Sequence, residues 1–142
     1  MKKSIVMILI ILGIGILSFL LYINFQNNNG DKDAIKLITK YWNGYKSYDA
    51  KTMSECFYGD YVIKNHTTIG DTGYFYTYEK PVIKYVSKYK KGEDYIYNYK
   101  LTCKYEAGTN KVEERGTTRG KIKLIKYKNS DKYYIYEEPT FK

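Results

Sequence analysis

The pattern of apolar and polar positions divides the chain into two parts. Residues 5–25 form a run without a single charged side chain. As a helix rising about 1.5 Å per residue, about 21 residues span about 30 Å, which is the thickness of a bilayer's hydrocarbon core. We therefore expect a membrane-spanning helix. Lys2 and Lys3 precede the run and a polar stretch follows it, so the positive-inside rule predicts a cytoplasmic N-terminus and an external C-terminal part.

A cleaved signal peptide is the alternative interpretation of this run. The apolar core of a signal peptide usually has about 7–15 residues and ends at a small-x-small cleavage site. Here the run is longer, and Leu21–Phe25 offers no such site. The preferred organisation is therefore a cytoplasmic stub and signal anchor over 1–26, a linker over 27–32 and an extracytoplasmic domain over 33–142. This organisation predicts a single-pass protein of a bacterial cell membrane.

The domain opens with helical spacing. Apolar residues recur three and four positions apart, which predicts one buried helix face: Ile35, Ile38, Tyr41, Trp42 and Tyr45. Asp31 or Asp33 can cap this helix. Asp49 begins a second, shorter helix whose inner face carries Met53, Cys56 and Phe57.

After this helical part the period changes to two. In residues 95–105 every odd position is aromatic, Leu or Cys, which predicts a strand with one buried face. Further β-rich segments are expected at 61–66, 81–90, 111–127 and 132–138, joined by short turns. Adjacent Leu124 and Ile125 suggest a bulge or a strand covered on both faces, and the glycines within Arg115–Gly120 suggest an irregularity. The predicted class is α+β, with two short helices on a curved antiparallel meander of four to five strands.

This arrangement resembles the nuclear transport factor 2-like superfamily of cone-shaped α+β domains. The resemblance rests on the aromatic-rich helix Ala34–Asp49, the following Met53–Phe57 and the closing meander to Tyr136. The superfamily's third helix has no evident counterpart between His66 and Pro81. Many members are catalytically inert, so the resemblance implies a binding or assembly domain.

Candidates for chemistry are few. His66 with Asp60 or Asp71 could form an acid–base dyad, but a lone surface histidine is the preferred interpretation. Cys56 and Cys103 are far apart and no second histidine exists, so the spacing of a zinc site is missing. Both cysteines are expected on core faces, and two buried free thiols are preferred over a disulfide. No catalytic residue, metal or cofactor is predicted.

The 19 tyrosines suggest a binding surface. The run from Tyr74 to Tyr78 cannot hide all of its rings on one strand face, so some should be exposed. We therefore name Tyr74, Tyr76 and Tyr78 as candidate ligand- or partner-binding residues, which aromatic rings suit by stacking. The alternative is that tyrosine serves as a good strand former that fills the core.

The formal net charge of +9 favours anionic partners but does not identify one. An exported domain meets little nucleic acid, so none is expected. The expected partners are the lipid bilayer through residues 5–25, other envelope proteins, and anionic wall polymers or headgroups. The preferred explanation of the charge itself is that lysine simply fills exposed strand positions and keeps the domain soluble.

Two classes of function follow. The preferred one is a non-enzymatic, membrane-anchored binding or assembly domain, for example in an envelope, secretion or conjugation complex. The alternative is a small-ligand-binding domain or enzyme that uses the concave face of the sheet. A filled core with an exposed aromatic patch would favour the first, and a deep pocket with converging polar groups the second.

Overall fold

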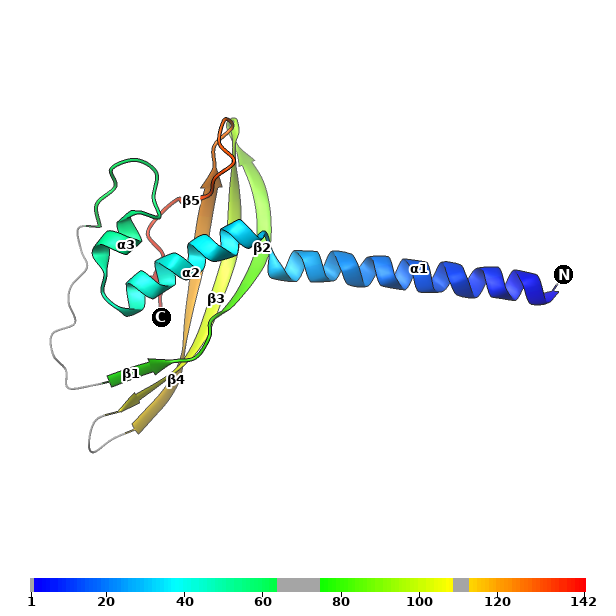
Figure 1. The fold of residues 1–142 in the computed structure, drawn as a ribbon, viewed down its shortest axis with the longest axis horizontal. Helices are drawn as coiled ribbons and strands as arrows, with labels where there is room; N and C mark the ends of the chain where they lie inside the picture. Colours follow the sequence, from blue (N-terminus) through cyan, green and yellow to red (C-terminus); the bar gives the residue numbers. More distant parts are fainter. Residues whose placement is uncertain (1, 64–74, 109–112) are drawn as a thin grey trace.

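The computed structural model describes residues 2–63, 75–108 and 113–142 (Figure 1). Within these described residues, three helices come first and six strands follow them. The elements are α1 (Lys2–Asn29), α2 (Lys32–Lys46), α3 (Ala50–Ser54), β1 (Phe75–Tyr78), β2 (Val82–Lys91), β3 (Asp94–Gly108), β4 (Glu113–Lys126), β5 (Tyr134–Ile135) and β6 (Thr140–Phe141).

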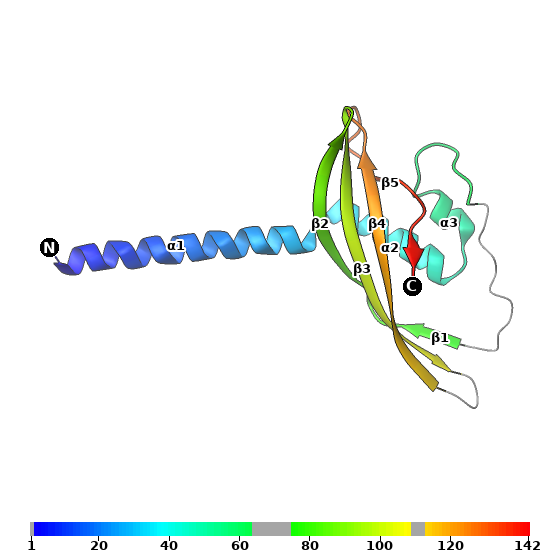
Figure 2. The ribbon, with the colours of Figure 1, turned by 180° about the vertical axis from the view of Figure 1, so that it is seen from behind.

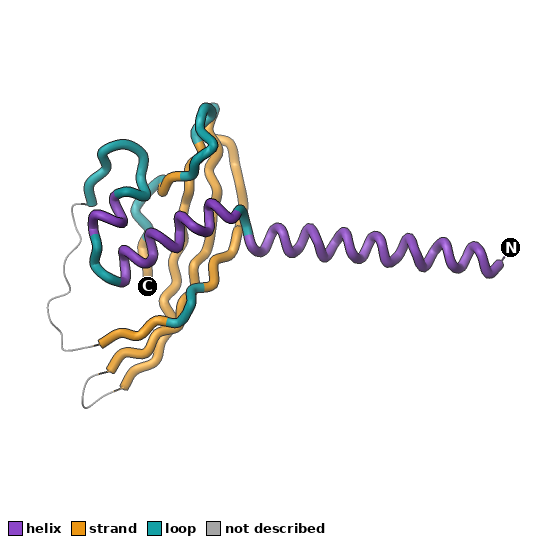
Figure 3. The backbone as a smooth tube through the Cα atoms, in the orientation of Figure 1, coloured by secondary structure: helices purple, strands orange, loops and turns teal. Residues whose placement is uncertain are grey.

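The strands form one antiparallel sheet around the long central pair β3 and β4. On one side, β1 and β2 both pair with β3, along different parts of its length. On the other side, β5 and β6 both pair with β4. The sheet is strongly curled, and α2 and α3 lie within its concave side, as Figures 2 and 3 show. The concave face is therefore the one that carries the core.

The sequence determines where α2 begins and ends. Asp31 is its N-cap, and the carboxylate accepts a hydrogen bond from the backbone N–H of Asp33 at 2.8 Å. The chain then turns at Tyr48, which has a positive φ of 56°, and Asp49 caps α3 through the backbone N–H of Thr52 at 3.0 Å. At Gly44 a Cβ atom would lie 2.9 Å from the side chain of Met53, so the absence of a side chain lets the two helices approach closely.

The core lies between α2, α3 and the concave face. Trp42 and Ile38 of α2 are completely buried. Leu101 of β3 and Ile122 of β4 are buried in the same core cluster. Among the described residues, the buried members of this core cluster are Ala34, Ile38, Tyr41, Trp42, Met53, Cys56, Phe57, Tyr99, Leu101, Cys103, Ile122, Leu124 and Ile135. The predicted inner face of the first helix is thus confirmed in most positions, although Ile35 and Tyr45 are only half-buried. The three residues predicted for the inner face of the second helix are all buried, but Cys56 and Phe57 follow the end of α3 instead of belonging to it.

The α+β class and the curled antiparallel sheet agree with the expectation from the sequence, but several strand predictions were wrong. Residues 61–63 are not a strand, and the rest of the segment expected at 61–66 lies outside the described residues. The segment expected at 132–138 is reduced to β5, and the two-residue β6 had no signal in the pattern. The described strands number six rather than four to five.

The two expected irregularities of β4 also need correction. Leu124 and Ile125 are both buried while their register with β3 continues unbroken, so the strand is covered on both faces and has no bulge there. The run Arg115–Gly120 is regular β4, because every residue in it has a direct partner in β3. A register shift occurs instead in β2, between Tyr85 and Ser87.

The expectation of a membrane-spanning segment is contradicted. Helix α1 extends away from the sheet (Figure 1), and its described large apolar side chains are 54–65% exposed. Nevertheless, within the part of the chain that the structure describes, no helix has both the length and the apolar character needed to cross a membrane. The signal anchor over residues 5–25, and the single-pass topology derived from it, are therefore corrected.

Candidate functional site

Three tyrosine rings meet on the concave side at the end of the sheet where β1 lies. Tyr78 of β1 is the direct cross-strand partner of Tyr105 in β3, and Tyr76 lies two residues earlier on the same face. The ring centroids of Tyr76 and Tyr78 are 6.2 Å apart. The ring centroid of Tyr105 lies 6.0 Å from that of Tyr76 and 6.1 Å from that of Tyr78. We call Tyr76, Tyr78 and Tyr105 the tyrosine cluster.

The tyrosine cluster is anchored to the core through Tyr78. Its ring meets the indole of Trp42 edge to face, with centroids 5.4 Å apart and an interplanar angle of 87°. Trp42 in turn stacks on Tyr45 at 5.6 Å and contacts Phe141 of β6 at 5.1 Å. Burial raises the pKa of the Tyr78 hydroxyl to about 12, so this group remains protonated at neutral pH. The half-buried ring of Tyr78 thus supports the more exposed ring of Tyr76.

Gly116 of β4 makes room for the third ring. It is the direct cross-strand partner of Tyr105, and a Cβ atom at this position would come within 3.0 Å of that ring. The ring of Tyr105 can therefore approach the backbone of β4 closely at this position. An aromatic ring that covers a cross-strand glycine also shields the backbone that the glycine leaves exposed.

The structure brings two of the three predicted binding residues together. Tyr76 is 43% exposed and Tyr78 is half-buried, while Tyr74 lies outside the described residues. Tyr105 is not among the residues predicted to bind, because the alternation of β3 places it on the buried face. Only its register with Tyr78, which depends on the pairing of β1 with β3, reveals that it belongs to this surface.

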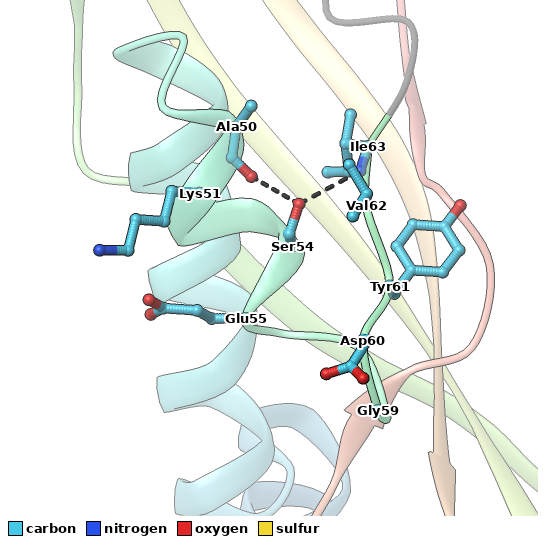
Figure 4. Close-up of a pocket in the computed structure, with 9 residues that line it drawn as sticks. All are labelled: Ala50, Lys51, Ser54, Glu55, Gly59, Asp60, Tyr61, Val62 and Ile63. Atoms are coloured by element: carbon cyan, nitrogen blue, oxygen red, sulfur yellow. Dashed lines mark hydrogen bonds between the residues drawn. The ribbon is translucent and has the colours of Figure 1, made fainter.

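A groove lies between α3 and the segment that follows it. Its volume is about 450 Å³, and its lining residues are Ala50, Lys51, Ser54, Glu55, Gly59, Asp60, Tyr61, Val62 and Ile63. Figure 4 shows that the hydroxyl of Ser54 joins its two walls. This hydroxyl donates to the carbonyl oxygen of Ala50 at 2.7 Å and accepts from the backbone N–H of Ile63 at 3.2 Å. Ser54 therefore acts as a structural link within the groove.

The charged side chains of this groove do not converge. Lys51 and Glu55 point away from the wall formed by Val62 and Ile63 (Figure 4). Glu55 instead forms an ion pair with Lys40 of α2, with Nζ and Oε2 2.9 Å apart. This pairing lowers the pKa of the Glu55 carboxyl group, which stays ionised as the partner of Lys40. The groove therefore lacks the arrangement of a general acid beside a general base.

The other candidates for chemistry give no assembled site among the described residues. His66 and Asp71 of the considered dyad lie outside those residues, and Asp60 is an exposed residue of the groove wall. Across residues 2–63, 75–108 and 113–142 no group of three His, Cys, Asp or Glu side chains is placed to hold a metal ion.

The two thiols are buried and free, as the sequence analysis preferred. Burial raises the pKa of Cys56 to about 11. Its sulfur donates to the carbonyl oxygen of Thr52 at 3.4 Å, and that of Cys103 donates to the carbonyl oxygen of Glu79 at 3.0 Å. Both cysteines therefore serve as packing residues rather than as activated nucleophiles.

The likeness to the nuclear transport factor 2-like superfamily rests on sequence pattern and general arrangement, and it stays a prediction. A scan against protein-family models, a search of curated proteins and a search of solved structures each found no match to this chain.

Proposed function

We propose that residues 30–142 form a non-enzymatic binding domain that docks a partner polypeptide on the tyrosine cluster. The observation that carries this proposal is the ring of Tyr76, which is 43% exposed yet held against two further rings at 6.0–6.2 Å. A large aromatic side chain that is both exposed and held in place by its neighbours loses little conformational freedom on binding. Such residues supply much of the binding energy at protein interfaces.

The tilt of the rings favours a polypeptide over a flat ligand. Tyr76 and Tyr78 are nearly parallel at 20°, but Tyr105 is inclined to them by 58° and 52°. The three rings therefore do not offer one level platform on which a sugar ring or a planar molecule could stack. An aliphatic or aromatic side chain of a partner fits better between inclined rings, and tyrosine is enriched at interfaces between proteins.

The filled concave face supports the same choice. Helix α2 occupies it, and Trp42, Tyr99 and Leu101 pack there with at most 2% exposure. A ligand-binding domain or enzyme that uses the concave face would need an open cavity at this place. The groove beside α3 has a suitable volume for a small ligand, but its polar groups do not converge. An assembly role, in which the domain holds another protein, is therefore the better supported class.

The test uses the whole chain and peptides selected against it from a random peptide library. Binding is followed through the fluorescence of Trp42, the only tryptophan, because Tyr78 lies against its ring. Tyr76→Ser is compared with Tyr89→Ser, which removes a ring of similar exposure, 44%, from β2. Tyr89 pairs with Ile96 and so lies on the opposite face of the sheet from Tyr76.

We expect Tyr76→Ser to weaken peptide binding by about tenfold or more, as loss of an interface anchor does. Tyr89→Ser should leave the affinity within about twofold, because exposed contacts outside an interface contribute little. Selected peptides that bind both variants equally well would place the binding surface elsewhere. Binding of sugars in preference to peptides would favour the small-ligand alternative.

A further inference from the structure

Three lysines lie side by side across the convex face of the sheet. Lys84 of β2 is the direct partner of Lys100 in β3, and Lys100 is the direct partner of Lys121 in β4. Lys100 stands between Tyr99 and Leu101, which point into the core, so it points out of the opposite face. All three side chains are exposed. We call Lys84, Lys100 and Lys121 the lysine row.

Further positive charge flanks the lysine row. Arg119 and Lys104 lie on the same face, two positions away along β4 and four along β3, and both are exposed. The ion pairs between described residues join Lys40 to Glu55, Arg115 to Glu106, Lys123 to Glu137 and Lys128 to Glu93. None of them involves the lysine row, Arg119 or Lys104. The centre of the convex face is therefore a basic surface whose positive groups form no ion pair among the described residues. Glu106, which lies on the same face two positions beyond Lys104, pairs with Arg115 instead.

Protection of a sheet edge does not account for this arrangement. Lysines on an edge strand prevent pairing with another chain, but Lys100 and Lys121 belong to the central strands β3 and β4. Solubility is served equally well by charges of both signs placed alternately. Like charges in direct cross-strand register destabilise a sheet instead. The row of three lysines therefore destabilises the sheet by repulsion, which a bound anion would relieve.

We propose that the lysine row binds a linear phosphate polymer along the convex face. Neighbouring strands are about 4.8 Å apart, so the row extends about 10 Å and can contact successive phosphates of a flexible chain. The positions in register beside these charges are Val82, Thr102, Thr117 and Thr140. They provide no aromatic ring on which a nucleobase could stack, which distinguishes this surface from sites for single-stranded nucleic acid. The proposal is independent of the tyrosine cluster, which lies on the other face.

The test is a calorimetric titration of the whole chain with inorganic polyphosphate at several salt concentrations. The triple variant K84Q/K100Q/K121Q is compared with K32Q/K36Q/K132Q, which removes the same charge from exposed lysines elsewhere. We expect the first variant to bind about tenfold or more weakly and its salt dependence to fall by roughly two counterions. The control should stay within about threefold of the unchanged chain, because distant exposed charges are screened.

A second variant separates binding from stability. Lys100→Glu places a negative charge between Lys84 and Lys121, so it should raise the melting temperature while weakening polyphosphate binding. A lower melting temperature together with unchanged binding would overturn the proposal, because the lysines would then be structural. An equal loss of binding in both triple variants would show that binding depends on the net charge of the chain. It would then overturn the assignment to the lysine row. Tighter binding of single-stranded DNA, an acidic peptide or anionic vesicles than of polyphosphate would overturn the assignment to a phosphate polymer.

Discussion

The ring of Phe141 lies directly over Gly120, its cross-strand partner between β6 and β4. A Cβ atom on Gly120 would come closer than 3.0 Å to this ring. Phe141 is also held by the core, with its centroid 4.6 Å from Tyr45 and 5.1 Å from Trp42. The glycine therefore allows a two-residue strand to close the aromatic core against α2.

Replacing Gly120 with alanine should lower the free energy of unfolding by about 1–3 kcal/mol, the usual cost of overpacking. Gly116→Ala is the matched control on the same strand. There the obstructing atoms are Cζ, Cε1 and the hydroxyl oxygen at the far end of Tyr105, which can move aside. At Gly120 they include Cγ and Cδ1, near the base of the Phe141 ring. Denaturant unfolding should show the larger loss for Gly120→Ala. The reverse order would mean that Phe141 is held less firmly than its contacts indicate.

Trp42→Ala should lower the free energy of unfolding by about 3–5 kcal/mol, because Trp42 is completely buried and contacts three other rings. Trp42→Phe should lower it less. The indole Nε1 is buried without a hydrogen-bond partner among the described residues, so removing it sacrifices no hydrogen bond. Denaturant unfolding of both variants measures the difference. Equal losses would indicate that Nε1 has a partner, such as a buried water.

The two thiols should be unreactive in the folded protein. Cys56 and Cys103 are at most 1% exposed, and burial raises the pKa of Cys56 to about 11, so little thiolate forms at pH 8. A disulfide reagent should label neither thiol in native conditions and both after unfolding without reductant. Fewer than two labelled groups in the unfolded chain would reveal a disulfide instead of free thiols.

Stability should fall steeply in alkaline solution. Burial raises the pKa of Tyr78 and of Tyr99 from 10.0 to about 12. Between these values the unfolded chain binds fewer protons than the folded one, so the free energy of unfolding decreases as the pH rises. The contribution of these rings is complete below about pH 10 and is lost toward pH 12. Tyr78→Phe should make the decrease shallower, as measured by denaturant unfolding at several pH values; an unchanged slope would mean that Tyr78 ionises equally in both states.

The periodic part of the fold was predictable from the sequence. The helix face with Ile38, Tyr41 and Trp42, and the alternation of residues 95–105, each report a single element with one buried side. Such patterns are local, because every residue in them follows the same rule of spacing. The α+β class followed from their order along the chain.

Features that depend on pairing were not predictable. A segment of two residues such as β6 is too short to form a pattern. It pairs with β4 where Phe141 packs over Gly120. The membership of Tyr105 in the tyrosine cluster depends on the register of β1 with β3. The alignment of Lys84 with Lys121 through Lys100 depends on the register of β2, β3 and β4. Register is fixed by the packed sheet and leaves no mark on the spacing within one strand.

The register shift in β2 also bears on aggregation. After the shift, Lys88 is the partner of Tyr97, so it points toward the concave side, with its Nζ 4.4 Å from the ring centroid of Tyr95. A lysine turned inward on an outer strand is expensive to bury against another chain, and a bulge bends the strand away from a flat template. Deleting Val86, which has no direct partner at the shift, would remove the bulge and leave Lys88 opposite Tyr97. The shift therefore hinders the edge of β2, an outer strand of ten residues, from pairing with other chains as strands do in fibrils.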